Sequence, residues 1–190
     1  MAMERSSPAR ATSGRADARR NYDALVQAGH DVFTAHGVDA PFDDVARRAG
    51  VGRGTLYRHF PSREHLFAVL IDDQLRHLEC LAHELITEPD SGAAVKQWLE
   101  AYDRASHSYR GLSRRLADGL KDETSPVAAA CAPMRRSFGQ LFAHAQQAGA
   151  VRPHLRAVDV LTLIAALPPN PDGKSSIKAH LDIAFRGLDT

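Results

Sequence analysis

Two glycines near residue 50 separate two short apolar-patterned stretches, FDDVARRA and RGTLYRHF. Asp43 and its acidic neighbour open the first stretch, where carboxylates suit the partial positive charge of a helix N-terminus. Gly50 is expected to end it, because a left-handed residue after a helix is least strained without a Cβ. The second stretch predicts a helix from about Arg53 to Phe60, with Leu56 facing inward. Two short helices joined by a glycine-bearing turn form a helix-turn-helix motif, whose second helix enters the major groove of DNA.

The charge of the chain is concentrated in the same region. Residues 45–63 contain five arginines and no acid, although the net charge of the whole chain is only +1. A local basic patch can neutralise phosphates without making the protein a general binder of polyanions. The two cysteines are too few for a disulfide framework or a structural zinc site, which indicates a reducing cytosol. No apolar run approaches the roughly 20 residues that span a bilayer. The sequence therefore predicts a cytoplasmic protein with no membrane partner.

A longer stretch, FDDVARRAGVGRGTLYRHFPSREHLF, resembles the DNA-binding domain of the TetR/AcrR family of bacterial transcriptional repressors. The resemblance extends over about fifty residues, from an amphipathic helix ending at Gly37 to the start of a fourth helix, and beyond about Leu85 it is one of layout only. One departure is Pro41, since members usually carry Ser or Thr there. Proline tolerates a helix start but cannot cap it or donate a hydrogen bond to phosphate.

The apolar periodicity predicts an all-α fold. Residues 1–16 are polar and arginine-rich and are predicted to be a disordered basic tail, which either contacts DNA beside the operator or is simply solvated. Residues 17–62 are predicted to form a three-helix DNA-binding domain that contains the helix-turn-helix motif. Residues 63–190 are predicted to form a helical ligand-binding and dimerisation domain. It is expected to begin with one continuous helix from Arg63 to about Ile86 and to end with a helix over residues 174–188.

Side-chain chemistry suggests how the second short helix contacts DNA. Arg53 has the planar fork that binds guanine O6 and N7 together, Gly54 allows the backbone to approach the bases, and Thr55 can contact a base edge, a thymine methyl or a phosphate. The family resemblance implies backbone contacts by Tyr57, His59 and Arg63, which position a protein without reading sequence. The alternative for Tyr57 and His59 is packing between helices. Basic side chains complete the predicted DNA-binding set, namely Arg47 and Arg58.

The resemblance also implies a homodimer and a small-molecule effector. Two apolar stripes are expected to form a four-helix dimer interface, unless they face the core of their own chain; they include Phe138, Leu141, Phe142, Ile177, Leu181 and Phe185. A pocket for an apolar or aromatic effector is predicted around Trp98, Tyr102, Leu116 and Phe138.

Enzymatic motifs are absent from the sequence: there is no phosphate loop, nucleophile elbow or HExxH, and we expect no catalytic residues and no cofactor. One alternative is a metal sensor on the same scaffold, using His77, Cys80 and His83 on one helix. Because His77 and His83 lie about 120° apart around a straight helix, these three ligands converge poorly. The sequence therefore predicts a DNA-binding regulator, a repressor that an effector releases from operator DNA, with no bound metal.

Overall fold

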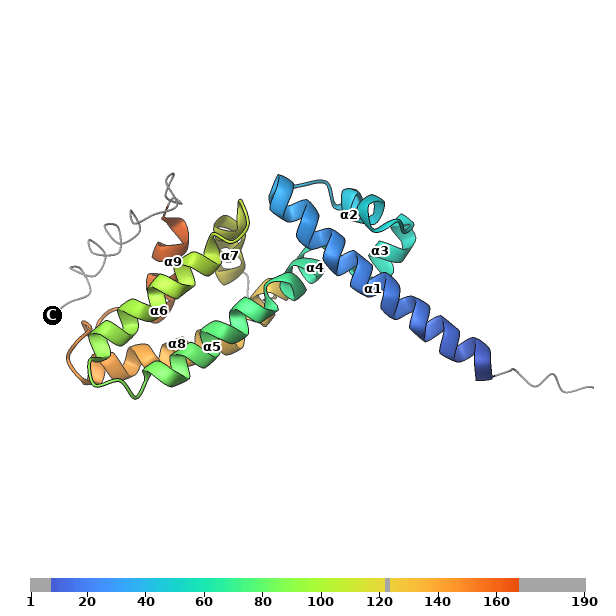
Figure 1. Ribbon diagram of the computed structural model, residues 1–190. Coiled ribbons are helices and arrows are strands. Elements are labelled where there is room, and N and C mark those ends of the chain that lie inside the picture. Colours follow the sequence, from blue (N-terminus) through green and yellow to red (C-terminus); the bar gives the residue numbers. More distant parts are fainter. Residues whose placement is uncertain (1–7, 122–123, 168–190) are drawn as a thin grey trace, which may run out of the picture. The chain divides into compact units, whose positions relative to one another are not determined.

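The computed structural model describes residues 8–121 and 124–167, and the side chains of residues 15–116 and 124–167. Every regular element in these ranges is an α-helix, which confirms the predicted all-α class (Figure 1). The chain divides into two compact units after Leu70. The predicted helix over residues 174–188 lies outside the described residues.

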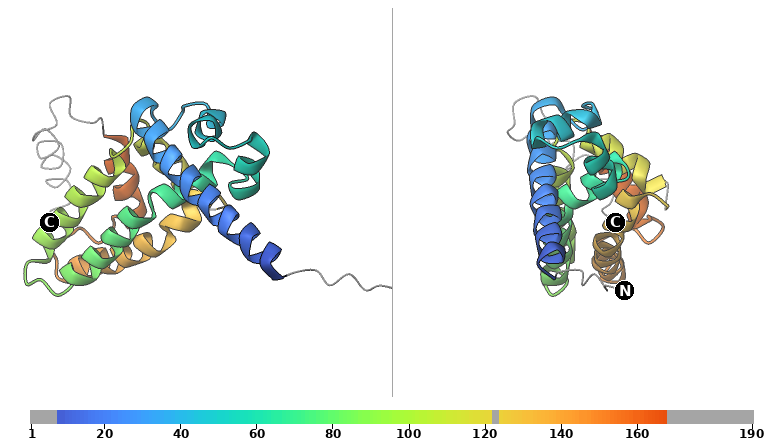
Figure 2. Two further views of the ribbon diagram at one scale, coloured as in Figure 1. Left: turned by 45° about the vertical axis from the view of Figure 1, so that its right-hand side comes forward. Right: turned by 90° about the vertical axis from the view of Figure 1, so that its right-hand side faces the viewer.

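The first unit contains four helices: α1 (Pro8–His36), α2 (Phe42–Ala49), α3 (Arg53–His59) and α4 (Arg63–Leu70). The long helix α1 carries the other three along one side (Figure 2). Its inner face buries Leu25, Ala28, Val32 and Phe33, and the ring of Phe33 lies 6.0 Å from that of Phe67 on α4. The two helices approach closely at Gly29, where an added Cβ would lie 2.8 Å from Cδ2 of Leu66. The α2–α3 pair thus packs against α1.

The first helix begins earlier than predicted. It includes residues 8–16, so the prediction of a disordered tail is wrong for that part; residues 1–7 lie outside the described ranges. Alanine and arginine are strong helix formers and make up much of the segment PARATSGRA, while Pro8 suits the first position of a helix. Low hydrophobicity indicated disorder, but helix propensity favours continuation of α1.

The predicted continuous helix from Arg63 to Ile86 is interrupted at Ile71, where φ is −97° and ψ is −3°. A new helix, α5 (Asp72–Leu85), begins with two aspartates in its first turn, where acidic side chains are favourable. The expected rigid connection is therefore two helices. Because α4 packs on α1, the first compact unit ends at Leu70 and not at Ser62 as expected from the sequence.

The second unit contains α5 and four further helices in the described residues: α6 (Ser91–Ser106), α7 (Leu112–Lys121), α8 (Pro126–Gln147) and α9 (Ala157–Ala166). Helices α5, α6 and α8 pack on one another, and α9 packs against α6, α7 and α8 (Figure 1). Ser125 caps α8 by accepting a hydrogen bond from the amide of Ala128 at 3.0 Å. Asp90 caps α6 by accepting from the amide of Ala93 at 2.9 Å.

The apolar stripe of α8 faces the core of its own chain. Met134, Phe138, Leu141, Phe142 and Ala145 are each at most 2% exposed in a single chain. The assignment of Phe138, Leu141 and Phe142 to a dimer interface is therefore wrong, because a partner has no surface of these side chains left to cover. The periodicity of the stripe was correct, but helical spacing alone does not say which neighbour covers a buried face.

Candidate nucleic-acid interface

The turn between α2 and α3 has the predicted glycine geometry. Gly50 takes the left-handed conformation, with φ of 68°, and its amide closes the end of α2 on the carbonyl groups of Ala46 and Arg47. Gly52 is extended and its carbonyl accepts from the amide of Thr55 at 2.9 Å, which begins α3. Pro41 precedes α2 without a side-chain cap. The hydrogen bonds at Gly50 and Gly52 therefore end α2 and begin α3 on either side of the turn.

One side of α3 is buried and the other is exposed. Leu56 and Phe60 enter the core of the first unit, at 0% and 2% exposure. Arg53, Gly54, Tyr57 and Arg58 are exposed, and Thr55 and His59 are half-buried. A Cβ built on Gly54 would meet no atom within 4 Å. The N-terminal part of α3 therefore presents one arginine and an unobstructed stretch of backbone to a partner.

Tyr57 and His59 combine packing with exposure. The ring of Tyr57 lies edge-on to Phe42, with centroids 5.5 Å apart, yet 42% of the residue remains exposed. The ring of His59 lies edge-on to Tyr22 of α1 at 6.1 Å, and Tyr22 stacks on Phe60. These contacts orient both side chains while Tyr57 stays partly exposed, so packing between helices is compatible with a contact to the DNA backbone.

Aspartates on α1 and α2 pair with three of the arginines. Arg53 Nη2 lies 3.1 Å from Asp43 Oδ2, and Arg47 Nη1 lies 3.0 Å from Asp44 Oδ1. The pair within α2 is the kind of exposed i,i+3 contact that contributes little stability. The pair between Arg53 and Asp43 is different because it connects the first turns of α2 and α3.

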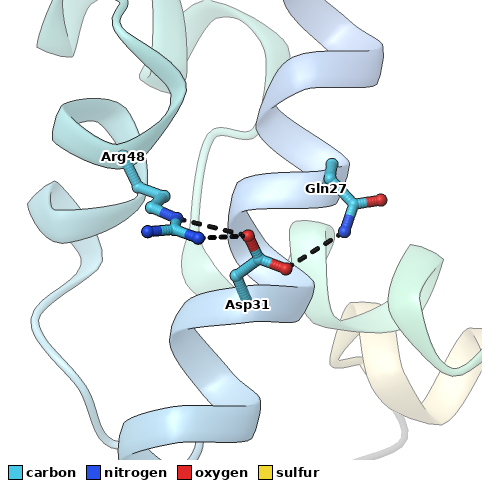
Figure 3. Close-up of polar contacts among 3 residues, drawn as sticks. All are labelled: Gln27, Asp31 and Arg48. Atoms are coloured by element: carbon cyan, nitrogen blue, oxygen red, sulfur yellow. Dashed lines mark hydrogen bonds and ion pairs between the residues drawn. The ribbon is translucent and has the colours of Figure 1, made fainter.

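A third pair fastens α2 to α1 (Figure 3). Both Nε and Nη2 of Arg48 donate to Oδ2 of Asp31, at 3.2 Å and 2.8 Å, and Gln27 donates to the other carboxylate oxygen at 3.0 Å. The hydrogen bond from Arg48, followed by that from Gln27, holds the pKa of Asp31 below its ordinary value. Arg48 is thus engaged within the protein, whereas Arg47 keeps 76% of its side chain exposed.

Arg63 also has an internal partner. Its guanidinium group donates a hydrogen bond to the carbonyl oxygen of Val38, in the loop between α1 and α2. The adjacent Ser62 hydroxyl lies 2.9 Å from Nδ1 of His65. The structure thus places Arg63 where it joins the start of α4 to the α1–α2 loop.

Sequence reasoning considered Asp43 and Arg53 separately and missed their pairing. It also did not connect Arg48 with Asp31. The opposite charges at positions 43 and 53 are visible in the sequence. Whether the two side chains meet depends on the angle between α2 and α3, which no local pattern gives.

The four residues predicted to line an effector pocket are buried in the second unit. Trp98 stacks on Phe138 at 4.1 Å and on Tyr102 at 5.5 Å, and its indole N–H donates to the carbonyl of Leu78 at 2.8 Å. Tyr102 and Leu116 line a cavity of about 10 Å³, which holds one water molecule at most. An open groove of about 400 Å³ lies between α5 and α6, and both spaces share Gln74, Leu78 and Ala105.

The metal alternative finds no support in the described residues. His77, Cys80 and His83 are all exposed on α5, and no group of three or more potential ligands within residues 8–121 and 124–167 is arranged to hold a metal ion. Another histidine of this unit, His107, has both ring nitrogens in contact with protein oxygens, Nδ1 with those of Asp103 and Nε2 with the carbonyl oxygen of Leu167. None of the helices in the same ranges is long and apolar enough to cross a membrane.

A helix-turn-helix unit with an exposed basic second helix, followed by an all-helical unit, defines a class of regulatory DNA-binding protein. Comparison with known families identifies the group within this class. Residues 25–70 match the model of the bacterial regulatory proteins of the tetR family, and residues 90–190 match the C-terminal domain of SbtR-like transcriptional regulators. The chain belongs to the TetR family of transcriptional regulators.

Individual relatives agree with this assignment. The HTH-type transcriptional regulators TtgW and SrpR of Pseudomonas putida are each 44% identical over 61 residues, 31% of this chain. The matches span only 46% and 29% of those proteins. A TetR regulator from Streptomyces coelicolor is 27% identical with a TM-score of 0.55, covering 88% of this chain and 98% of its own. One from Mycobacterium vanbaalenii is 29% identical with a TM-score of 0.50, covering 93% and 99%.

Proposed function

We propose that this protein is a cytoplasmic, homodimeric repressor that binds a two-half-site operator and is released by a small apolar or aromatic effector. The observation that supports DNA reading most directly is the start of α3, where Arg53 keeps 72% of its side chain exposed beside the open backbone of Gly54. An arginine fork next to an unobstructed backbone suits the edge of a guanine in the major groove.

The surrounding side chains suit contacts with the DNA backbone. Tyr57, Arg58 and Arg47 are exposed, while Thr55 and His59 are half-buried at its margin. Phosphate contacts of this kind set register and orientation, and base contacts by Arg53 supply the discrimination. Arg63 retains its family role only if it releases the carbonyl of Val38 or shares its donors between that oxygen and a phosphate.

Effector binding is proposed for the space between α5, α6 and α7. The described cavity is too small for an effector, so a ligand must displace side chains or shift a helix to enter. The adjoining groove offers a route. Beside it, Ser108, which lies in the loop after α6, donates a hydrogen bond of 3.1 Å to Gln74 of α5. Ile71, the residue at which the helix is interrupted, lines the same cavity. A ligand that fills the cavity therefore contacts Ile71, the residue that immediately precedes α5.

Dimerisation is proposed through the C-terminal stripe of Ile177, Leu181 and Phe185, which lies outside the described residues. A protein that reads two half-sites needs two copies of α3, related by two-fold symmetry, about 34–36 Å apart. An effector that changes this separation weakens operator binding by its preference for the non-binding state. A typical coupling of about 1–3 kcal/mol corresponds to roughly 5–150-fold in affinity.

The proposal is tested by selecting bound duplexes from a randomised DNA library with the purified full chain. We expect enrichment of a two-fold-related sequence bound by two chains. On the selected operator, Arg53→Ala should cost about 1–3 kcal/mol, with little loss on random DNA. Recovery of no preferred sequence would contradict operator recognition. Equal losses on both duplexes would show that Arg53 contacts phosphate only.

Effector release is tested with the selected operator. Apolar and aromatic compounds are screened for a change in Trp98 fluorescence, and each hit is titrated into the protein with and without operator. An inducer must bind the free protein more tightly, by the same factor by which it weakens DNA binding. A compound that binds both forms equally is not the inducer.

A further inference from the structure

Arg53 of α3 forms an ion pair with Asp43 of α2. The two residues lie in the first turns of α3 and α2, and Arg53 Nη2 is 3.1 Å from Asp43 Oδ2. The arginine side chain is 72% exposed and the aspartate side chain is 35% exposed. The pair therefore joins an exposed arginine at the start of α3 to a less exposed carboxylate in the first turn of α2.

The two oxygens of the Asp43 carboxylate have different surroundings. Asp43 Oδ1 is buried and has no hydrogen-bond partner, while Oδ2 faces Arg53. A carboxylate with one oxygen enclosed by protein cannot rotate freely in solvent. Asp44 and Asp31 engage Arg47 and Arg48, so Asp43 is the carboxylate found on Arg53.

The guanidinium geometry leaves Arg53 able to bind a base. The group has five N–H donors arranged in a rigid plane, and the contact with Asp43 uses Nη2. Nη2 has a second hydrogen. This N–H and an N–H of a neighbouring nitrogen point in the same direction along one edge of the plane, so they form two parallel donors. A guanine accepts from two such parallel donors through O6 and N7. The ion pair and a bidentate base contact can therefore exist together.

We propose that Asp43 is a positioning and specificity-determining residue that orients Arg53 for guanine and restrains it from binding phosphates indiscriminately. The inference rests on the operator recognition proposed above. A pre-oriented side chain loses less conformational freedom on binding, and each immobilised long side chain otherwise costs about 0.5–1.5 kcal/mol. In addition, the charges of Arg53 and Asp43 compensate each other. If Arg53 moved to a phosphate, the negative charge of Asp43 would be left without its partner near the DNA. Both effects favour the correct base pair over random sequence.

The test measures dissociation constants of the full-length protein at fixed salt for three duplexes: the selected operator, the operator with the guanine facing Arg53 replaced, and a random sequence. The variants are Asp43→Asn, Arg53→Ala and the double variant, with Asp44→Asn as the matched control. Asp43→Asn should lower the ratio of operator to random affinity by about 2- to 10-fold. It should also make the dependence of log affinity on log salt steeper by about one, because the released arginine gains a phosphate contact.

The discrimination lost in Asp43→Asn should be confined to the base pair that Arg53 contacts and should vanish in the Arg53→Ala background. Asp43→Glu, which keeps the charge, should restore part of it. An equal change on all three duplexes would overturn the positioning role, because removal of a negative charge would then explain the result. An effect that persists without Arg53 would also overturn it, since Asp43 would then act through the stability of α2. If the unmodified protein prefers no sequence, the proposed function fails together with this inference.

Discussion

The indole ring of Trp98 stacks on the phenyl ring of Phe138, with centroids 4.1 Å apart and planes 19° from parallel. Both residues are fully buried, and they join α6 to α8 at the centre of the second unit. The indole N–H is fixed on the carbonyl of Leu78, so the same tryptophan also connects α5. Trp98 is the single tryptophan of the chain, and its fluorescence therefore reports on the packing of three helices.

Phe138→Ala should destabilise the second unit by about 3–5 kcal/mol, because it removes a large buried ring and leaves a cavity beside the indole. Urea unfolding followed by Trp98 fluorescence measures the loss. The exposed neighbour Gln140→Ala is the matched control and should change stability by no more than about 0.5 kcal/mol. A Phe138→Ala protein as stable as the control would mean that the core collapses around the lost ring.

Gly29→Ala should destabilise the first unit by about 1–3 kcal/mol, because the new methyl group would lie 2.8 Å from Cδ2 and 3.3 Å from Cγ of Leu66. Leu66 is 0% exposed and has little room to move. Gly139 on α8 is the matched control, since a Cβ there meets no atom within 4 Å. Gly139→Ala should stabilise by about 0.5–1 kcal/mol through helix propensity. Thermal unfolding by circular dichroism distinguishes the two signs.

Local patterns in the sequence were sufficient to predict the helix-turn-helix motif and the all-α class, and they mark helix ends where the signal lies beside the helix. Gly50 follows the apolar face of α2, and Ser125 with Pro126 precedes that of α8; in each case the residue that ends or begins the helix is adjacent to the helix itself. The interruption at Ile71 has no such mark. The apolar repeat continues across it, and two aspartates indicate a helix N-terminus only weakly.

Contacts between segments that are far apart in the sequence could not be predicted from the apolar periodicity. An amphipathic stripe such as that of α8 indicates burial, but the partner that buries it is set by the packing of α5 and α6. The same applies to the candidate site, where Arg53 and Tyr57 were identified by type while their partners Asp43 and Phe42 follow from the angle between two helices. The predicted pocket residues are buried in the second unit, where the stacking of Trp98 on Tyr102 and Phe138 leaves little open space.

His107 provides a prediction about pH. Its Nδ1 lies 3.0 Å from the carbonyl oxygen and 3.3 Å from the carboxylate of Asp103, and its Nε2 lies 3.2 Å from the carbonyl oxygen of Leu167. A carbonyl oxygen can only accept, so both ring nitrogens must carry hydrogens for both contacts to be hydrogen bonds. The hydrogen bond and charge of Asp103 outweigh burial and raise the pKa of His107 above its ordinary value. The imidazolium form connects α6 to the end of α9.

Because the pKa of His107 is raised in the folded protein, its contribution to the free energy of unfolding is fully present below the unfolded pKa of about 6.5. It is lost as pH rises through the folded value. The unmodified protein should therefore lose stability relative to His107→Gln between about pH 6 and the folded pKa. Urea unfolding at several pH values measures this difference. His83→Gln, at an exposed histidine of α5, is the control and should leave the pH dependence unchanged. Parallel curves for the unmodified and His107→Gln proteins would show that the imidazole is neutral.

Gly54→Ala separates DNA contact from folding. In the free protein a methyl group at position 54 meets no atom within 4 Å, and alanine in the helix should stabilise the first unit by about 0.5–1 kcal/mol. If the backbone of α3 approaches the bases, the same methyl group lies between protein and DNA, and operator affinity should fall by about 1–3 kcal/mol, as in other overpacked contacts. Thermal unfolding and operator titration on one preparation therefore give opposite signs. Gly139→Ala, which gains a methyl group on α8, should raise stability without changing operator affinity. A Gly54→Ala protein that is more stable and binds the operator as tightly as the unmodified chain would show that the start of α3 does not approach the base edges.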